Sequence, residues 1–425
     1  MSKKILVVGG GGREHAIIKA LKKSPDCGEV WCAPGNGGIG YDAHCVNIKA
    51  TDVETMVGFA ETEKFDYVVV AQDDPLALGM VDALAAVGIP AFGPDKAAAR
   101  IEASKVFSKD LMKKYGIPTA KYETFDDPAK VMEYIKAEGK YPVVIKADGL
   151  AAGKGVVVAM DIETAHHAVD DMLEGHKFGA AGARVVIEDY LDGEEASFIV
   201  MVDGEHILPL ATSQDHKRLL DHDMGPNTGG MGAYSPAPVV TPEIHAQVMR
   251  DIIEPTVKGM AKDGLPYSGF LYAGLMIGKD GKAKTLEFNC RMGDPETQPI
   301  MSRITGDFAK VLKAAADGHL DTVTLDWDDR AALGVVVAAH GYPESPRKGD
   351  VITALPKNDA LHHVFHAGTK TNDKGELVTA GGRVLCVVGL GKTIREARDA
   401  AYEAADQVHF NGAQMRRDIG YRALK

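Results

Sequence analysis

The residues with the clearest chemical potential stand at alternate positions of one expected strand. The run is Glu287-Phe288-Asn289-Cys290-Arg291. Because side chains alternate between the two faces of a strand, Glu287, Asn289 and Arg291 share one face. A carboxylate, an amide oxygen and a guanidinium side by side suit a hard cation such as Mg²⁺ that bridges phosphates, and do not suit zinc. The alternative is the polar outer face of a sheet, and these residues alone leave both interpretations open.

A lysine within an apolar strand is the second candidate. Lys146 interrupts the apolar run at residues 141–147. A lysine in that position must reach the surface, pair with an acid or meet a bound anion. A structural ion pair remains the alternative. Lys105, on an expected helix, is weaker evidence because a helical lysine is usually solvated.

Two glycine loops follow the first two expected strands, at residues 9–13 and 34–38. Glycine lets backbone N–H groups approach an anion at the start of a helix. A phosphate cradle beside Arg13 is therefore one interpretation, and a tight turn is the other. A dinucleotide fingerprint is absent, because Glu14 and His15 occupy the position of its small third residue.

A third glycine-rich loop, at residues 149–155, follows the strand with Lys146. It is not a P-loop, because the spacing is one residue short and Gly155 stands where Ser or Thr would bind magnesium. We expect this loop to fold over phosphates as a lid, with a surface turn as the alternative.

Polar segments follow in the middle of the chain. An apolar strand at residues 184–191 leads into acids that include Glu195, and a carboxylate there could accept hydrogen bonds from a ribose. Residues 214–218 are polar, and the glycine-rich segment 225–232 is too long for a simple turn. His216 receives no catalytic role, because a lone histidine more often packs or faces solvent.

The order of expected elements divides the chain into three parts. Residues 1–103 alternate strands with helices, which is typical of a doubly wound parallel sheet with ligands at the carboxyl ends of its strands. Residues 104–330 mix helices with hairpins and predict an antiparallel α+β domain with a small lobe at about 120–190, and residues 331–425 predict a third, α+β unit. Expected strands are 5–8, 29–33, 66–71, 88–93, 141–147, 155–159, 184–190, 197–202, 205–210, 271–277, 283–289, 331–339, 365–369 and 383–388, and expected helices are 15–23, 76–87, 104–115, 164–173 and 394–408.

Composition excludes several classes of protein. A net charge of −12 argues against a protein that binds nucleic acid or a membrane surface. The five cysteines are odd in number and form no C-x-x-C pair, so a disulfide framework or a structural zinc site is not expected and a reducing cytoplasm fits. The apolar run near the start is too short for a signal peptide, and no run of about 18 apolar residues is present to span a membrane.

Taken in order, these motifs resemble those of the phosphoribosylamine–glycine ligase family. The similarity extends nearly from end to end of the chain. Any one motif is modest evidence, but all of them in this order are highly specific. The matching segments are VVGGGGREH at 7–15, PGNGG at 34–38, KADGLAAGKGV at 146–156, QDHKR at 214–218, NTGGMG at 227–232, EFN at 287–289, R-x-GDPE at 291–296 and RRDIG at 416–420.

The resemblance implies an ATP-dependent carboxylate–amine ligase of the ATP-grasp class. Two α+β lobes would hold ATP between them, next to an N-terminal doubly wound domain and a C-terminal α+β capping domain. The reaction would join glycine to 5-phosphoribosylamine through glycyl phosphate, in de novo purine biosynthesis. ATP and Mg²⁺ or Mn²⁺ would be required. We expect a cytoplasmic monomer, with a dimer as the alternative, and no nucleic-acid or membrane partner.

The resemblance also implies roles for individual residues. Adenine would meet mainly the backbone of residues 188–191, and Glu195 would hold the ribose. Glu287 and Asn289 would bind the metal. Our candidates for the catalytic groups are Arg291, Asp294 and Asp215, and with Asn227 they are also the candidates for contact with glycine. ATP would be held by Lys105, Lys146, Gly153, Lys154, Gly155, Glu188, Tyr190, Leu191, Glu195 and Lys217. The other substrates would be held by Gly10, Gly12, Arg13, Glu14, Gly35, Asn36, Gly37, Asn227, Thr228 and Gly229.

One departure from the family and three rival functions remain. The family carries Gly-Pro-Glu where this chain has Ala71-Gln72-Asp73, which leaves a carboxylate one methylene shorter at one edge of the sugar site. The rivals are a related ATP-grasp ligase that uses another small carboxylate, such as formate or bicarbonate, a non-catalytic nucleotide-binding regulator, and an NAD-dependent dehydrogenase. The missing dinucleotide fingerprint already weakens the third.

Overall fold

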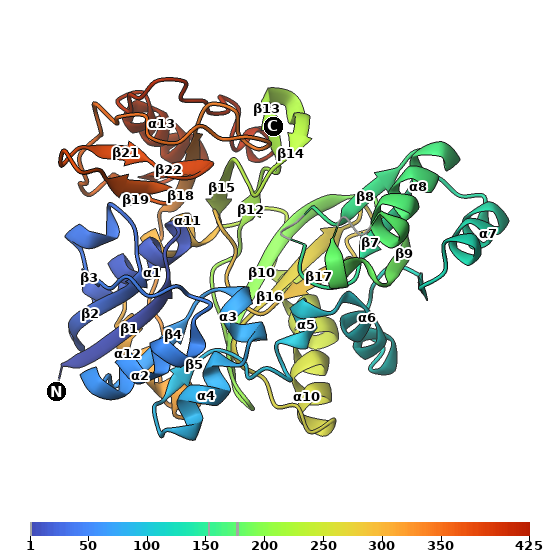
Figure 1. Ribbon diagram of the computed structural model, residues 1–425, viewed down its shortest axis with the longest axis horizontal. Coiled ribbons are helices and arrows are strands. Elements are labelled where there is room, and N and C mark those ends of the chain that lie inside the picture. Colours follow the sequence, from blue (N-terminus) through green and yellow to red (C-terminus); the bar gives the residue numbers. More distant parts are fainter. Residues whose placement is uncertain (1, 152–153, 176–177) are drawn as a thin grey trace.

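The computed structural model describes residues 2–151, 154–175 and 178–425, which fold into a body of three packed sheets and a small lobe that projects from it (Figure 1). The predicted fold class is confirmed: a parallel α/β sheet comes first, followed by antiparallel α+β sheets. None of the described helices is long and apolar enough to cross a bilayer.

The N-terminal sheet is parallel and has the strand order β3-β2-β1-β4-β5. In its central strand β1, Ile5, Leu6, Val7 and Val8 form an apolar run at 0% exposure, as expected for a strand covered on both faces. The strands are β1 (Lys3–Gly9), β2 (Cys27–Pro34), β3 (His44–Cys45), β4 (Tyr67–Val70) and β5 (Ala91–Phe92), and the helices are α1 (Gly12–Lys22), η1 (Ile39–Tyr41), α2 (Val53–Glu63), α3 (Asp73–Ala77) and α4 (Met80–Ala86).

The single helix predicted at residues 76–87 is wrong. Two short helices, α3 and α4, replace it, because Gly79 between them has a left-handed backbone with φ of 86°. A left-handed residue ends the i to i−4 hydrogen-bond ladder, and glycine takes that conformation without a Cβ clash.

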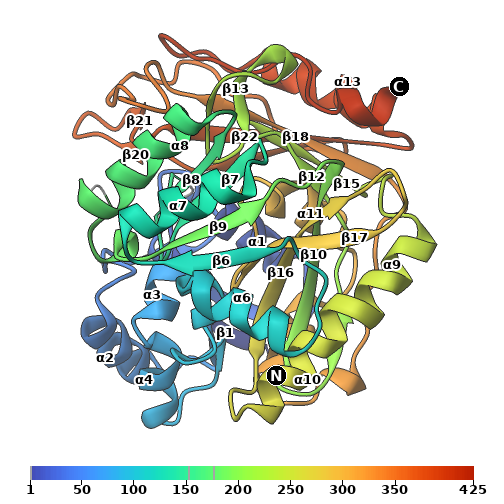
Figure 2. The same ribbon diagram turned by 90° about the vertical axis from the view of Figure 1, so that its right-hand side faces the viewer.

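The small lobe contains an antiparallel sheet in the order β6-β9-β7-β8 with its own apolar core (Figure 2). The strand with Lys146 lies inside this sheet. Helix α6, which leads into the lobe, begins where the Ser104 hydroxyl accepts a hydrogen bond from the N–H of Phe107. The elements are α5 (Arg100–Ala103), α6 (Lys105–Lys114), β6 (Tyr122–Phe125), α7 (Pro128–Glu138), β7 (Val143–Ala147), β8 (Val156–Ala159), α8 (Ile162–Val169), η2 (Asp170–Glu174), η3 (Gly179–Gly182) and β9 (Val185–Asp189).

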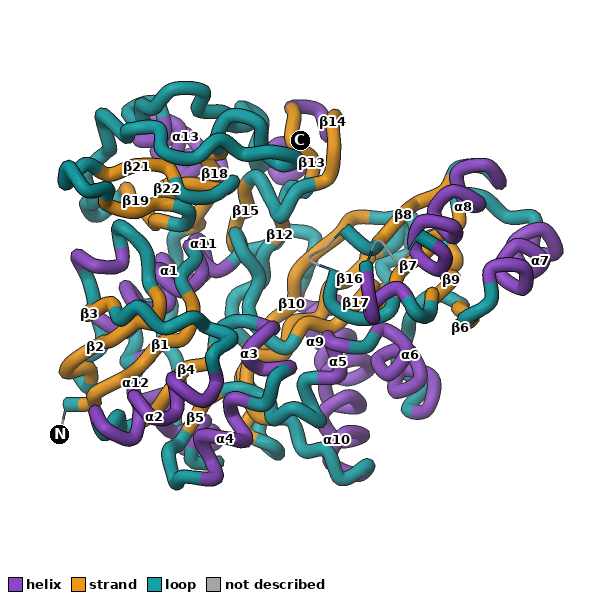
Figure 3. Tube along the Cα trace, viewed as in Figure 1, coloured by secondary structure: helices purple, strands orange, loops and turns teal. Residues whose placement is uncertain are grey.

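The central sheet is antiparallel, in the order β11-β10-β16-β17, and its two predicted hairpins are confirmed. The tube in Figure 3 shows its long strands running between the N-terminal sheet and the small lobe. The elements are β10 (Glu194–Asp203), β11 (Ile207–Pro209), α9 (Pro242–Val248), η5 (Met249–Ile253), α10 (Glu254–Lys262), β16 (Ser268–Ile277), β17 (Ala283–Asn289), α11 (Thr297–Ser302), α12 (Phe308–Ala316) and η6 (Leu320–Thr322).

The C-terminal sheet, ordered β12-β15-β18-β22-β19, takes two strands from before residue 331. Helix α13 packs on it, and β19 lies three residues earlier than the predicted strand at 365–369. The elements are β12 (Gln214–Asp215), β13 (Arg218–Leu220), η4 (Asp221–Asp223), β14 (Met224–Asn227), β15 (Gly232–Ser235), β18 (Ala331–Ala338), β19 (His362–His366), β20 (Thr369–Thr371), β21 (Leu377–Thr379), β22 (Arg383–Gly391), α13 (Ile394–Ala405) and η7 (Tyr421–Leu424).

Candidate functional site

A cavity of about 160 Å³ lies where helix α6, strand β7 of the small lobe and strand β17 of the central sheet meet. Its walls combine cations with acids, while apolar residues such as Ile101 and Met112 close its floor. Lys146 and Glu287 therefore share one cavity, although they come from different sheets. The charged and amide side chains that line it are Asp73, Glu102, Lys105, Lys109, Lys146, Glu188, Glu287, Asn289 and Arg291.

Two lysines flank one buried carboxylate in this cavity. Lys146 Nζ lies 2.7 Å from Glu188 Oε2 and donates to the Leu286 carbonyl at 3.2 Å. Lys109 pairs with the other oxygen of Glu188. Burial alone would raise the pKa of Glu188, but the two lysines lower it, so the carboxylate is ionised. Of the three possibilities for Lys146, the ion pair with an acid is thus present in this structure, inside a cavity that also has room for an anion.

Lys109 is a cavity residue that the sequence analysis missed. It lies one helical turn after Lys105 on α6, so both side chains project from the same face of that helix. Burial lowers the pKa of Lys109, and Glu188 opposes this effect. The four-residue spacing from Lys105 is the signal that could have identified it.

Lys105 joins α6 to the third glycine loop. Its Nζ donates to the Gly149 carbonyl at 3.0 Å, and burial lowers its pKa. Asp148 fixes the start of the loop, because its Oδ1 accepts from the N–H of Val106 at 3.2 Å. Gly155 is buried and Lys154 is exposed, whereas the predicted site residue Gly153 lies outside the described residues.

Strand β17 delivers the predicted metal ligands. A β-bulge places Glu287 opposite Gly274, and Glu287, Asn289 and Arg291 all line the cavity. Burial would raise the pKa of Glu287, but Lys217, Lys146 and Lys105 lower it. Within the described residues, no hydrogen bond engages the Glu287 carboxylate or the Asn289 side chain. An ionised carboxylate and an amide with uncommitted oxygens fit Mg²⁺ or Mn²⁺.

Glu102 is a second residue that the sequence analysis missed. This buried carboxylate accepts from Arg291 Nη2 at 3.1 Å and from the N–H of Cys290 at 2.8 Å. Although burial alone would lower the pKa of Arg291, Glu102 and Asp73 raise it. Asp73, from the segment that departs from the family pattern, therefore acts on Arg291 inside the cavity. No pattern predicted Glu102, because the short helix α5 that carries it was not predicted.

Lys217, Glu195 and Asp215 form a neighbouring polar group. Lys217 Nζ lies 2.9 Å from Glu195 Oε2. Burial raises the pKa of Asp215 to about 7, with Glu296 and Glu195 adding to the effect and Lys217 opposing it. Glu195 raises the pKa of Lys217 well above its usual range. Tyr190 is exposed and Leu191 is half-buried near the same strand end.

The first glycine loop packs against the segment after β17. Arg13 Nε donates to Glu14 Oε2 at 2.9 Å, and the Arg13 N–H donates to Asp294 Oδ2 at 3.2 Å. Gln72 Nε2 donates to Glu14 Oε1 at 2.7 Å, so Glu14 is engaged entirely by protein. Burial would raise the pKa of Asp294, but Arg383 and Arg13 lower it. Gly12 has no room for a side chain, because a Cβ there would overlap Gln298.

The second glycine loop is fixed by Asn36. Its Nδ2 donates to the carbonyls of Gly10 at 3.0 Å and His366 at 2.7 Å, and its Oδ1 accepts from the N–H groups of Gly38 and Ile39, both at 2.9 Å. The side chain of Asn36 is therefore already satisfied by protein groups. Its neighbours are equally constrained: Gly35 has φ of 77°, and the N–H of Gly37 donates to Thr369 at 3.0 Å.

The third predicted substrate segment follows strand β14. Thr228 donates to the Lys217 carbonyl from its N–H at 2.7 Å and from its hydroxyl at 2.8 Å. The N–H of Gly229 donates to the Tyr342 hydroxyl at 3.0 Å, and Asn227 is exposed. This segment thus connects Lys217 to the C-terminal unit.

Comparison with known proteins places this arrangement in a family. Three models of phosphoribosylglycinamide synthetase match the chain: the N domain over residues 3–102, the ATP-grasp (A) domain over 103–297 and the C domain over 332–422. The phosphoribosylamine–glycine ligase of Ralstonia nicotianae is 60% identical over 422 residues, which are 99% of this chain and 100% of that protein.

Solved structures agree with these matches. The crystal structure of phosphoribosylamine–glycine ligase from Thermotoga maritima has a TM-score of 0.86 at 37% identity and covers 98% of this chain and 100% of its own. Biotin carboxylase from Campylobacter jejuni, at 15% identity, shares the fold alone, with a TM-score of 0.77 over 98% of this chain and 93% of its own. The chain belongs to the phosphoribosylglycinamide synthetase family, whose members are also named phosphoribosylamine–glycine ligases.

Proposed function

We propose that this chain joins glycine to 5-phosphoribosylamine to give glycinamide ribonucleotide, while ATP is converted to ADP and phosphate. The observation that carries the proposal is the shared cavity, in which Lys146 and Lys105 face Glu287 and Asn289. Full-length relatives at high identity that are named for this ligation support the same assignment.

The chemistry requires two anions to react. Phosphoryl transfer from ATP to the glycine carboxylate replaces a very poor leaving group with phosphate and gives glycyl phosphate. The amine of phosphoribosylamine then attacks the carbonyl carbon, the amide bond forms and phosphate leaves. Neither step needs a covalent enzyme intermediate, so the work of the protein is positioning and charge neutralisation.

The cavity supplies the cations for this neutralisation. Lys105 and Lys146 hold ATP phosphates, and Lys146 exchanges its ion pair with Glu188 for the bound anion. Glu287 and Asn289 would hold a divalent cation, which would neutralise charge on the phosphates. Arg291 stays charged because Glu102 and Asp73 raise its pKa, so it is available to glycine or to the transferring group.

The remaining ATP contacts are assigned by position. Residues 188–191 meet adenine mainly through their backbone, and Glu195 holds the ribose with Lys217 beside it. The loop that contains Gly153, Lys154 and Gly155 covers the phosphates and excludes water, which would hydrolyse the acyl phosphate.

We assign the sugar phosphate to the start of α1. Within the described residues, the N–H groups of Gly10 and Gly11 donate no hydrogen bond, although both precede the first turn of this helix. Unpaired N–H groups at a helix start favour an anion. Gly12, Arg13, Glu14, Gly35, Asn36 and Gly37 shape this cradle, and Asn227, Thr228, Gly229, Asp215 and Asp294 complete the substrate side.

The domain boundaries, the cellular location and the oligomeric state of the chain are also proposals. We retain the division into residues 1–103, 104–330 and 331–425, with a small lobe at about 120–190, although the C-terminal sheet shares strands across the second boundary. A cytoplasmic monomer is the form we propose, with a dimer as the alternative that sedimentation would identify.

A coupled assay of ADP release tests the function. We expect ADP only when ATP, glycine and freshly prepared phosphoribosylamine are present together, and amide formation in equal amount. Formate or bicarbonate in place of glycine should give no turnover, and rapid turnover with either would assign the chain to a related ligase. Tight ATP binding without ADP release under any combination would indicate a regulator. To identify the preferred cation, a chelator first removes bound metal from the enzyme, and ADP release is then measured as Mg²⁺ or Mn²⁺ is added back.

A further inference from the structure

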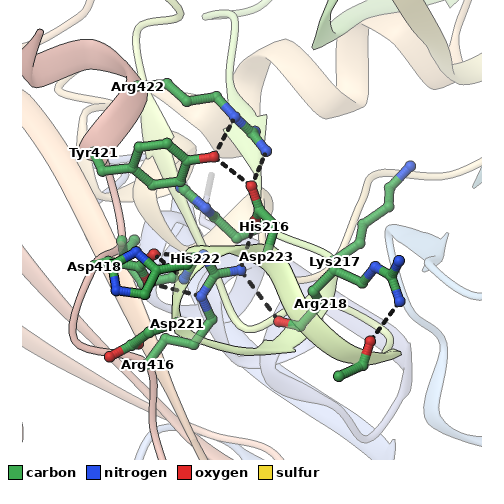
Figure 4. A network of polar contacts seen from close by, with 12 residues as sticks. His216, Lys217, Arg218, Asp221, His222, Asp223, Arg416, Asp418, Tyr421 and Arg422 are labelled. Atoms are coloured by element: carbon green, nitrogen blue, oxygen red, sulfur yellow. Dashed lines mark hydrogen bonds and ion pairs between the residues drawn. The ribbon is translucent and has the colours of Figure 1, made fainter.

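The last residues of the chain pack against a hairpin that lies nearly two hundred residues earlier (Figure 4). The hairpin consists of β13 and β14, joined by η4. It projects from the body beside the C-terminal unit in Figure 1. We call residues 416–422 the C-terminal latch.

Arg416 is the centre of this contact. Its side chain is fully buried, yet it carries a charge. Its Nε and Nη2 donate to the two oxygens of Asp418, each at 2.8 Å, while Nη1 donates to Asp223 Oδ1 at 3.0 Å and to the Arg218 carbonyl at 3.2 Å. A buried guanidinium is stable only when acids and hydrogen bonds compensate for its lost hydration. Here two of those partners, Asp223 and the Arg218 carbonyl, belong to the hairpin.

The aspartates connect the two segments a second time. Asp418 Oδ2 also accepts from the N–H of His222 at 2.9 Å, and Asp221 Oδ1 accepts from the N–H of Arg417 at 2.8 Å. Burial would raise the pKa of Asp418, but Arg416 and the N–H of His222 lower it to about 2. The carboxylate therefore stays ionised and keeps its bonds to Arg416 and to the N–H of His222 across the normal pH range.

The tip of the hairpin depends on these contacts. His222 and Asp223 have left-handed backbones, with φ of 61° and 55°. Residues other than glycine rarely take that conformation, although Asp and His do so more readily than most, and surrounding contacts stabilise it here. Asp223 is fixed by Arg416, by the Tyr421 hydroxyl and by Arg422 Nη2 at 3.0 Å.

The base of the hairpin belongs to the candidate site. Lys217 immediately precedes β13 and pairs with Glu195, and its carbonyl accepts both hydrogen bonds from Thr228, which immediately follows β14. His216 next to Lys217 is fully buried, and its Nε2 accepts from the N–H of Gly420 at 3.0 Å. Burial, Arg416 and Arg422 lower the pKa of His216 to about 3, so the ring remains the neutral acceptor that this bond requires.

We propose that Arg416 is a positioning residue for the ligase reaction: through the hairpin it fixes Lys217 and Thr228 at the site, which it does not itself touch. This inference rests on the proposed function. The pairs of Arg416 with Asp418 and Asp223 hold the tip of the hairpin. Its bond to the Arg218 carbonyl and the bond from Gly420 to His216 hold the base. Release of the latch removes the contacts of Arg416 and of Gly420 with the hairpin, while Lys217 keeps its pair with Glu195 and its bonds with Thr228.

The test compares Arg416→Lys with Arg417→Lys. The second variant is a matched control, because Arg417 is exposed and its side chain pairs with Asp406, away from the hairpin. Lysine keeps the charge but cannot form the paired bonds to Asp418. We expect kcat/KM for ADP release to fall roughly 10- to 100-fold for Arg416→Lys and less than about 2-fold for Arg417→Lys. Melting curves recorded by circular dichroism should show that both variants are still folded at the assay temperature.

A double-mutant cycle separates positioning from general damage. If Arg416 acts through Lys217, then Arg416→Lys should cost less than about 3-fold once Lys217→Ala is already present. Hydrogen exchange of residues 216–230 should also become faster in Arg416→Lys, while exchange in the small lobe stays unchanged. The proposal would be overturned if Arg416→Lys lowered kcat/KM as much in the Lys217→Ala background as in the wild type. It would also be overturned if hydrogen exchange of the hairpin were unchanged.

Two further outcomes are decisive. If Arg416→Lys does not fold, Asp418→Asn carries the same measurements, because it removes the charge that fixes the guanidinium and keeps the shape. If the wild-type chain shows no ligase activity, the proposed function fails. In that case hydrogen exchange still decides whether the latch holds the hairpin.

Discussion

The cavity beside β17 and the glycine loops beside β1 are both polar, but their polar groups are engaged differently. In the cavity, Lys146 and Lys109 pair with Glu188, and the Glu287 carboxylate has no hydrogen bond within the described residues. In the loops, every polar atom of the Asn36 side chain is bonded to backbone, and Glu14 is bonded to two side chains.

The difference indicates how each region receives a ligand. An ion pair at the wall of a cavity can change partners when a phosphate enters, because the lysine gains a comparable contact. A half-buried amide such as that of Asn36, which already forms its full set of hydrogen bonds, gains nothing from a ligand and loses stability if it moves. We therefore expect side chains to bind ATP in the cavity, whereas the loops bind the sugar phosphate through backbone N–H groups. Replacements should accordingly affect turnover in the first region and folding in the second.

The largest expected effect is on turnover, from Glu287→Ala. Without this carboxylate the divalent cation loses its only charged protein ligand in our proposal, so ADP release should fall by roughly 10²- to 10³-fold while the melting temperature changes little. Lys284→Ala, at an exposed position of the same strand, is the control. A near-normal rate for Glu287→Ala would show that the metal assignment is wrong.

The second effect is on folding, from Gly38→Ala in the second loop. A Cβ at Gly38 would overlap the ring of His366, which is buried at the end of β19 in the C-terminal sheet, so we expect a loss of about 1–3 kcal/mol in the free energy of unfolding. At Gly40 a Cβ meets nothing within 4 Å, and Gly40→Ala should leave stability nearly unchanged. Urea unfolding of both variants gives the comparison. Equal stabilities would mean that the loop adapts more readily than its packing indicates.

The fold was predictable where the chain is most apolar. β1, β7 and β16 are built mainly on apolar runs whose side chains are buried, so burial determines their structure almost regardless of context. Helices α7, α9, α10 and α12 were missed, although caps such as Asp127 and Thr241 precede two of them. Strands as short as β3 and β12, with two residues each, depend on pairing partners from distant segments, and no local pattern encodes that pairing.

The candidate site was predictable where a polar residue interrupts an apolar strand. Glu287, Asn289 and Lys146 stand out for that reason. Lys109 and Glu102 do not, because charged residues on a helix resemble a solvated face until packing buries them. The role of Asn36 was equally hidden, since its two carbonyl partners come from segments 26 and 330 residues away.

A third, smaller effect would sharpen the contrast within the cavity. Glu102→Gln keeps an acceptor for the N–H of Cys290 but removes the charge beside Arg291. We expect a fall of roughly 10-fold in kcat/KM, because a charge-assisted bond that orients the guanidinium becomes a neutral one. Glu61→Gln, at an exposed position, is the control. If Glu102→Gln lowers the melting temperature without changing kcat/KM, then Glu102 stabilises the cavity wall and does not orient Arg291 for the reaction.

The smallest effect concerns the pH dependence of stability in the loop region. Burial, with His15 and Lys19 adding to the effect, lowers the pKa of His366 from its usual 6.5 to about 3. Between these values the unfolded chain binds a proton that the folded chain does not. This contribution to stability is therefore complete above pH 6.5 and is lost as the pH falls below it.

The measurement follows from that sign. In the wild type, the free energy of unfolding should fall as the pH falls from 6.5 to 5. In His366→Gln this fall should be smaller by about 1.4 kcal/mol per pH unit, as measured by urea unfolding at several pH values. His319→Gln is the control, because His319 is exposed in the folded chain as it is in the unfolded one. An unchanged slope in His366→Gln would mean that the ring is protonated in the folded state. The loop region would then contain a charged side chain that could change partners, as the lysines of the cavity can. The proposed difference between the two regions would then be wrong.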